Sequence, residues 1–203
     1  EIYTLSLHDA LPIFDVVTGA QTTKLLPDDG AALDQFGWSV AISGDYVIVG
    51  ARFDDDNGAD SGSAYLFDAT TGAQIAKLTP SDGAAADQFG SAVGIDADSA
   101  IIGALGGDDN GANSGAAYLF DVATATQTAK LLASDAAPSD QFGFSVAIAN
   151  GTAIVGALLD DDNGANSGSA YLFDADSGSQ IAKLLPSDGA GGDQFGYSVS
   201  IGG

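Results

Sequence analysis

The chain of 203 residues contains no cysteine and very little positive charge. Five basic residues stand against 28 acidic ones, which gives a net charge of −23. A field of this sign repels phosphate backbones, so we expect no nucleic-acid partner. No apolar run approaches the roughly 20 residues that span a bilayer, so we expect no membrane insertion in this segment. Because cysteine is absent, the sequence does not indicate whether the protein belongs to an oxidising or a reducing compartment.

Glutamate is almost absent as well, because 27 of the 28 acidic residues are aspartate. The short aspartate side chain hydrogen-bonds to nearby backbone and favours turns over helices. We therefore expect the negative charge to lie in loops. With 45% hydrophobic and 16% charged residues, the chain can build a buried core.

Residues 1–13, EIYTLSLHDALPI, have no counterpart elsewhere, whereas positions from Phe14 onward recur 53 residues later. The segment resembles the conceptual translation of a sequencing adaptor, and we predict that it is non-native. A piece of signal peptide is the alternative, but a basic start is missing and His8 and Asp9 interrupt the apolar run. His8 is the only histidine, so the repeats contain none.

The rest of the chain is a tandem repeat. Complete 53-residue units cover 14–66, 67–119 and 120–172, and a partial unit covers 173–203. Between residues 36 and 89, four strand signals, FGWSVAIS, YVIVGA, SAYLFD and AQIAKLT, are separated by turn residues. Four short antiparallel strands in such a repeat are typical of propeller blades. We predict an all-β fold, a β-propeller of four-stranded antiparallel blades, present as an incomplete, open fragment that self-associates through its open ends.

Two strand patterns refine this prediction. In FGWSVAIS, alternation places the large side chains Phe36, Trp38, Val40 and Ile42 on one face. The other face carries small residues, which suit a crowded site such as a central channel. YVIVGA is apolar on both faces, as in a strand sandwiched between sheets.

The lysines lie at one equivalent position of the fourth strand, namely Lys24, Lys77, Lys130 and Lys183. Lysine on an outer strand guards against edge-to-edge pairing. An ordinary solvated charge is the other interpretation.

A Phe-Gly pair recurs in every unit, at Phe36-Gly37, Phe89-Gly90, Phe142-Gly143 and Phe195-Gly196. In the three complete units a Gly-Ala pair follows 13 residues after that glycine. This pattern over residues 14–203 resembles FG-GAP repeats, which build the N-terminal propeller of integrin α chains and occur in bacterial secreted proteins. The resemblance implies an extracellular or cell-surface protein with an adhesion-type role.

Two departures limit what this resemblance implies. The proline of GAP is replaced by Arg52, Leu105 and Leu158. The calcium loop that such repeats carry between FG and GAP is missing, because the interval holds only SGDY, DADS and ANGT. The usual metal site of the family is therefore absent.

Acidic residues instead cluster after the second strand of each repeat. Carboxylate and amide oxygens suit calcium, so these loops are candidate calcium sites. The candidate ligands are Asp54, Asp55, Asp56, Asn57, Asp60, Asp108, Asp109, Asn110, Asp160, Asp161, Asp162 and Asn163. An EF-hand spacing fails, since its first position falls on Phe53, Gly106 or Leu159. Asn-Gly turns with local aspartate-to-backbone bonds are the alternative.

The loops after the second and fourth strands must emerge on one face, because the strands run alternately up and down. These loops hold 18 of the 27 aspartates. In propellers of the integrin type this is the ligand face, so the resemblance implies a protein or carbohydrate partner that docks there.

We predict that the protein is not an enzyme, with no catalytic residue and no cofactor other than possible calcium. Near-identical repeats offer no pair of carboxylates set apart for acid and base roles. The expected function is a non-enzymatic extracellular interaction module. An accessory or structural propeller of a larger secreted enzyme is the alternative.

Overall fold

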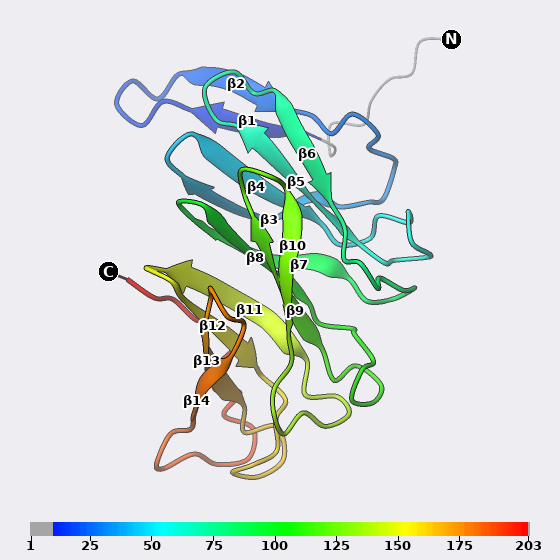
Figure 1. Cartoon of the computed structure of the whole chain (residues 1–203), viewed down its shortest axis with the longest axis vertical. Coiled ribbons are helices and arrows are strands. Elements are labelled where there is room, and N and C mark those ends of the chain that lie inside the picture. The colour runs from blue at the N-terminus through cyan, green and yellow to red at the C-terminus, as the bar shows by residue number, and fades with distance from the viewer. Residues whose placement is uncertain (1–9, 203) are drawn as a thin grey trace.

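The computed structural model describes residues 10–202, and all regular secondary structure in this range is β-strand. Three four-stranded antiparallel sheets follow a two-stranded N-terminal pair (Figure 1). The pair consists of β1 (Leu11–Phe14) and β2 (Gln21–Leu25). The first sheet contains β3 (Phe36–Ser43), β4 (Tyr46–Ala51), β5 (Ser63–Asp68) and β6 (Gln74–Leu78). The second contains β7 (Phe89–Asp96), β8 (Ser99–Ala104), β9 (Ala116–Asp121) and β10 (Thr126–Leu131). The third contains β11 (Phe142–Ala149), β12 (Thr152–Ala157), β13 (Ser169–Asp174) and β14 (Gln180–Leu184).

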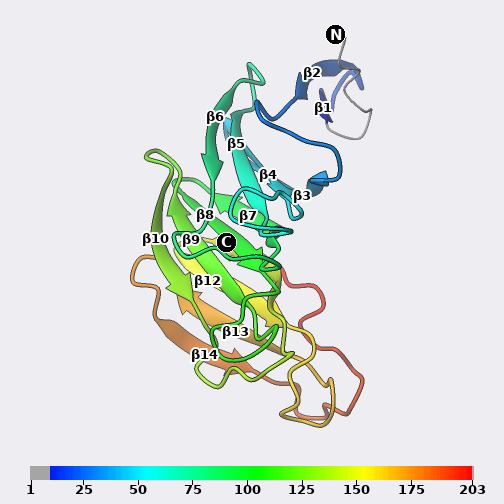
Figure 2. The ribbon, with the colours of Figure 1, turned by 90° about the vertical axis from the view of Figure 1, so that its right-hand side faces the viewer.

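The all-β class and the four strands predicted between residues 36 and 89 are confirmed. In every four-stranded sheet the strands pair in sequence order, so each connection is a hairpin. The sheets follow one another along an arc from the β1–β2 pair to β14 (Figure 2). Among the described residues, no helix offers a long apolar stretch that could cross a membrane.

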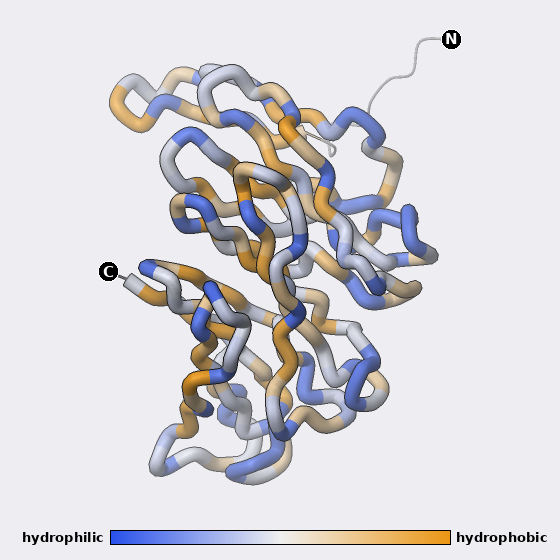
Figure 3. The backbone as a smooth tube through the Cα atoms, viewed as in Figure 1, coloured by the Kyte–Doolittle hydropathy of each residue, from blue (hydrophilic) through white to orange (hydrophobic). Residues whose placement is uncertain are grey.

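Apolar side chains form a layer between each pair of neighbouring sheets. One layer joins the β1–β2 pair to the first sheet, the next joins the first and second sheets, and another joins the second and third. Val47 and Val49 belong to the first of these layers and Ile48 to the second. YVIVGA is therefore buried on both faces, as predicted. Figure 3 shows hydrophobic colour along the strands and hydrophilic colour in many of the loops.

The alternation predicted for the first strand is broken by a bulge. The register between β3 and β4 shifts between Phe36 and Ser39, so Trp38 does not share the burial of Phe36. Phe36 is buried and makes edge-to-face contacts with Tyr65 and Phe67, whereas Trp38 is half exposed. The prediction that Phe36 and Trp38 share one environment is therefore wrong.

The small residues of the first strand face the next sheet rather than a channel. Ser39 Oγ donates to the carbonyl oxygen of Gly90 at 2.8 Å. A Cβ added to Gly50 would collide with that same carbonyl group, and the pair Gly103 and Gly143 repeats the contact one sheet later. The Phe-Gly glycine of one sheet thus meets the Gly-Ala glycine of the sheet before it.

The β1–β2 pair corresponds to the third and fourth strands of a repeat. Pro12 pairs with Lys24, as Tyr65 pairs with Lys77. Residues 11–13 belong to the segment predicted to be non-native, and they pack as a strand against the first sheet. That origin stays a prediction, and His8 and Asp9 lie outside the described residues.

Candidate functional site

Two sets of loops meet at one edge of the sheets. One set follows the second strand of each sheet, at 52–62, 105–115 and 158–168, and the other precedes the first strand, at 26–35, 79–88 and 132–141. The Phe53 N–H donates to the Asp34 carbonyl oxygen at 3.2 Å, and the Gly106 and Leu159 N–H groups donate to Asp87 and Asp140 in the same way. We call these two sets of loops, together with residues 185–194, the acidic loop face. Its predicted formation on one side of the molecule is confirmed.

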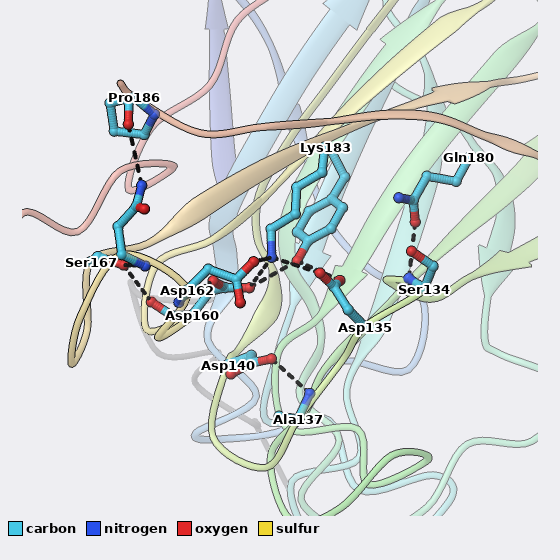
Figure 4. A network of polar contacts seen from close by, with 12 residues as sticks. Ser134, Asp135, Ala137, Asp140, Asp160, Asp162, Ser167, Gln180, Lys183 and Pro186 are labelled. Carbon is cyan, nitrogen blue, oxygen red and sulfur yellow. Dashed lines mark hydrogen bonds and ion pairs between the residues drawn. The ribbon is translucent and has the colours of Figure 1, made fainter. Parts of the chain in front are cut away.

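A lysine ammonium group lies at the centre of the loops of the third sheet (Figure 4). Lys183 Nζ is 2.8 Å from Asp135, 2.9 Å from Asp160 and 2.5 Å from Asp162. The Tyr171 hydroxyl group lies 2.8 Å from Asp160 and 3.0 Å from Asp135. We call this arrangement a lysine centre. It joins the fourth strand to both sets of loops.

The first sheet repeats this arrangement. Lys77 Nζ is 2.7 Å from Asp29, 3.0 Å from Asp54 and 2.5 Å from Asp56, and the Tyr65 hydroxyl group lies 3.0 Å from Asp29 and 2.9 Å from Asp54.

The second sheet has one carboxylate fewer. Lys130 Nζ is 2.6 Å from Asp82 and 2.5 Å from Asp109. Gly107 stands where the other sheets have Asp54 and Asp160.

The interpretation of these three lysines as solvated charges is wrong, because their side chains are only 15–20% exposed and their ammonium groups face carboxylates. They lie on the outer strands β6, β10 and β14, and a role against edge-to-edge pairing stays a prediction. Lys24 differs, because it is exposed and lies opposite Pro12 instead of a tyrosine. From sequence, strand register could have indicated only that each of these lysines lies opposite a tyrosine, not that loop carboxylates surround it.

The contacts in the lysine centres shift the pKa values of the lysine and aspartate side chains. Burial alone would lower the pKa of Lys183, but hydrogen bonds to Asp135 and Asp162 outweigh it and raise the pKa well above the usual range. Lys77 and Lys130 are raised in pKa for the same reasons. Burial would raise the pKa of Asp160, yet hydrogen bonds from Lys183, the Asp162 backbone and Tyr171 lower it. The ionised forms of lysine and aspartate therefore stabilise each other.

The aspartates before the first three Phe-Gly pairs are buried rather than displayed on the face, whereas Asp193 before the fourth pair is exposed. Asp34, Asp87 and Asp140 are each less than 9% exposed and accept the backbone N–H of the residue three positions earlier at 2.6–2.8 Å. Burial raises the pKa of all three carboxyl groups. They shape the loops and contribute little to the exposed charge.

The candidate calcium ligands fall into two groups. Asp54, Asp56, Asp109, Asp160 and Asp162 are bound to lysine. Asp55, Asp108 and Asp161 accept the backbone N–H of the residue five positions later, which is Asp60, Asn113 or Asn166, at 2.6–2.8 Å.

The amide residues of these loops also serve local structure. Asn57, Asn110 and Asn163 donate their backbone N–H to a serine hydroxyl group four positions later. Within residues 10–202, the acidic side chains that converge do so around lysine ammonium groups, and no group of acidic or histidine side chains is arranged to hold a metal ion. With lysine in place, these residues do not fit a calcium ion, and calcium binding stays a prediction.

One corner of the acidic loop face differs from the others. The only arginine, Arg52, lies over the only tryptophan, Trp38, with its guanidinium carbon 3.3 Å from the ring centre. Its Nε donates to the Gln35 side chain at 2.8 Å. A cavity of about 320 Å³ lies beside it, lined by Leu33, Gln35, Phe53, Asp55 and their neighbours.

Fold and site together define a class, an all-β repeat protein whose four-stranded sheets present lysine-clamped acidic loops along one edge. The chain belongs to the FG-GAP repeat family. The model of this family matches residues 20–67, 73–120, 125–173 and 179–203. The resemblance seen in the Phe-Gly and Gly-Ala pairs is confirmed.

Two computationally designed proteins with crystal structures have a similar fold. Ika8 matches with a TM-score of 0.55 and 14% identity, over 87% of this chain and 43% of its own. Ika4 matches with a TM-score of 0.53 and 16% identity, over 84% of this chain and 81% of its own. The chain thus spans less than half of Ika8, and at these identities the likeness concerns the fold alone. No curated protein matches the chain.

Proposed function

We propose that the three sheets are blades of an open β-propeller. The first strands β3, β7 and β11 contact one another in succession, as strands around a common axis would. Each sheet also covers an apolar face of its neighbour. Val40 and Ile42 of the first sheet are 52% and 62% exposed, and these side chains would be covered by the inner strands of a further blade.

We propose that this scaffold is a non-enzymatic interaction module of an extracellular or cell-surface protein. Membership of the FG-GAP repeat family supports this location and role. The observation that carries the proposal is the acidic loop face, where rigid sheets hold both sets of loops together. A partner would be a protein or carbohydrate with basic groups, or one that is bridged by cations.

The exposed aspartates that do not belong to a lysine centre are the groups that would contact the partner. Asp28, Asp60 and Asp188 lie on the acidic loop face, are exposed, and belong to none of the three lysine centres. Asp45, Asp98 and Asp176 lie in hairpins at the opposite end of the strands. These two sets of three form a matched pair for experiment.

The test compares two triple variants of equal net charge, in which either set of three aspartates is replaced by lysine. The probe is a lysine- and arginine-rich peptide on a biosensor surface, and an array of immobilised glycans is the second probe. We expect reversal on the acidic loop face to weaken peptide binding at least about tenfold more than reversal on the opposite hairpins. Equal loss in both variants would contradict a binding face.

An accessory role beside a catalytic domain would use the same blades without a ligand. Binding to neither probe at low salt would favour that role, because a charged face should bind most strongly when screening is weak.

A further inference from the structure

Each lysine centre ties together three segments that are distant in sequence. In the third sheet these are β14 with Lys183, the loop before β11 with Asp135, and the loop after β12 with Asp160 and Asp162. An ammonium group has three N–H donors and no acceptor. Three carboxylate oxygens within 2.5–2.9 Å of Nζ therefore use its full donor capacity.

The carboxylates around Lys183 cannot stand together without a positive charge. The Asp160 side chain is only 4% exposed, and Asp135 and Asp162 approach the same nitrogen from opposite loops. Like charges at such separations repel strongly where water is excluded. A divalent cation bound by carboxylates would solve the same problem.

We propose that the ammonium groups of Lys77, Lys130 and Lys183 take the place of a metal ion, so that the acidic loops are ordered without calcium. The tyrosine of each centre supports this role, since its ring lies 5.1–5.3 Å from Nζ. In the first and third sheets its hydroxyl group also donates to the buried aspartate. The charge that organises each loop pair is part of the chain. This inference does not depend on the proposed binding function.

The second sheet provides an internal control. Gly107 replaces the buried aspartate, and Ala116 replaces the serine that follows it as Ser63 or Ser169 in the other sheets. Lys130 holds two carboxylates instead of three. If lysine stands in for a metal, its removal should leave a stronger cation site in the third sheet than in the second.

The experiment follows thermal unfolding of the full chain, Lys183→Met, Lys130→Met and Lys24→Met, each in EDTA and in calcium. We expect the midpoint of the unmodified chain to be equal in both. Lys183→Met should unfold about 10 °C lower in EDTA and recover several degrees in calcium. The midpoint of Lys130→Met should fall less in EDTA and recover less in calcium. The midpoint of Lys24→Met should equal that of the unmodified chain.

Terbium luminescence sensitised by the nearby tyrosine gives a second measurement that does not depend on the midpoint. We expect Lys183→Met to gain terbium binding relative to the unmodified chain. If Lys183→Met fails to fold in EDTA, recovery of a folded circular dichroism spectrum on adding calcium supports the proposal equally. Calcium stabilisation of the unmodified chain as large as that of Lys183→Met would overturn it, as would a Lys183→Met midpoint that neither falls nor responds to calcium.

Discussion

The second and third sheets come from the same 53-residue repeat, yet their lysine centres differ by one buried carboxylate. Lys183 contacts the buried Asp160, whereas the equivalent position beside Lys130 is Gly107. The strands, register and lysine-tyrosine pairing are otherwise alike. The buried carboxylate is therefore an addition to a scaffold that forms without it.

A second position changes together with this carboxylate. A Cβ on Gly107 would lie 3.5 Å from the Ala116 Cβ atom, so the two positions face each other. Where aspartate is present the facing residue is Ser63 or Ser169, and where it is absent the facing residue is alanine. Polar and apolar residues thus occur in matched pairs, which avoids burying a carboxylate against a methyl group.

Replacement of the lysines should give the largest difference between the two sheets. Lys183→Met leaves the buried Asp160 without its cation and should lower the free energy of unfolding by about 3 kcal/mol. Lys130→Met leaves only partly exposed carboxylates and should cost about 1 kcal/mol. Denaturant unfolding measures both. Equal losses would mean that the buried carboxylate does not depend on lysine.

Conversion of one centre into the other should have an intermediate effect. Asp160→Gly leaves the Lys183 and Tyr171 groups short of a partner, and we expect a loss of about 2 kcal/mol. Adding Ser169→Ala should cost little more, because the serine hydroxyl group has then lost its polar neighbour. A double-mutant cycle measures the coupling. Strictly additive losses would show that the two positions act independently.

Acid should weaken the third sheet through Asp160, which has no counterpart in the second sheet because Gly107 stands there. The folded pKa of Asp160 lies below its unfolded value of about 3.9, so its contribution is present above that pH and is lost as the pH falls through the folded pKa. The unmodified chain should lose more stability below about pH 4 than Asp160→Asn.

The pKa of Asp140 is shifted in the opposite direction, so this residue serves as the control for the titration of Asp160. Its folded pKa is raised by burial, so it adds stability as the pH falls toward its unfolded value. Asp140→Asn should therefore lose at least as much stability in acid as the unmodified chain. Parallel acid profiles for all three proteins would contradict these assignments.

The smallest effect on unfolding should come from the exposed face of the first sheet. Ile42 is 62% exposed, whereas the equivalent Ile95 and Ile148 are buried by a neighbouring sheet. Ile42→Lys should change the free energy of unfolding by no more than about 0.5 kcal/mol, and it should reduce self-association. Sedimentation velocity, with Ile95→Lys as the destabilised comparison, checks this expectation. Association that is unchanged in Ile42→Lys would place the contact elsewhere.

Much of the fold could be predicted from sequence because strand period, turn residues and the repeat all indicate the same strands. The position of both loop sets on one face follows from strand alternation alone. The lysine centres could not be predicted in this way, since Lys183, Asp135 and Asp160 meet only through strand register and loop conformation. The burial of Phe36 apart from Trp38 was missed because a bulge breaks the alternation.

The ammonium groups themselves provide the most direct test of the lysine centres. We propose an NMR spectrum of the ¹⁵N-lysine-labelled full chain in calcium-free buffer near neutral pH. Slowly exchanging ammonium signals should appear for Lys77, Lys130 and Lys183, assigned by single Lys→Met variants, and should persist unchanged when calcium is added. Absence of these signals without calcium, or their loss on adding it, would contradict the claim that lysine takes the place of a metal ion.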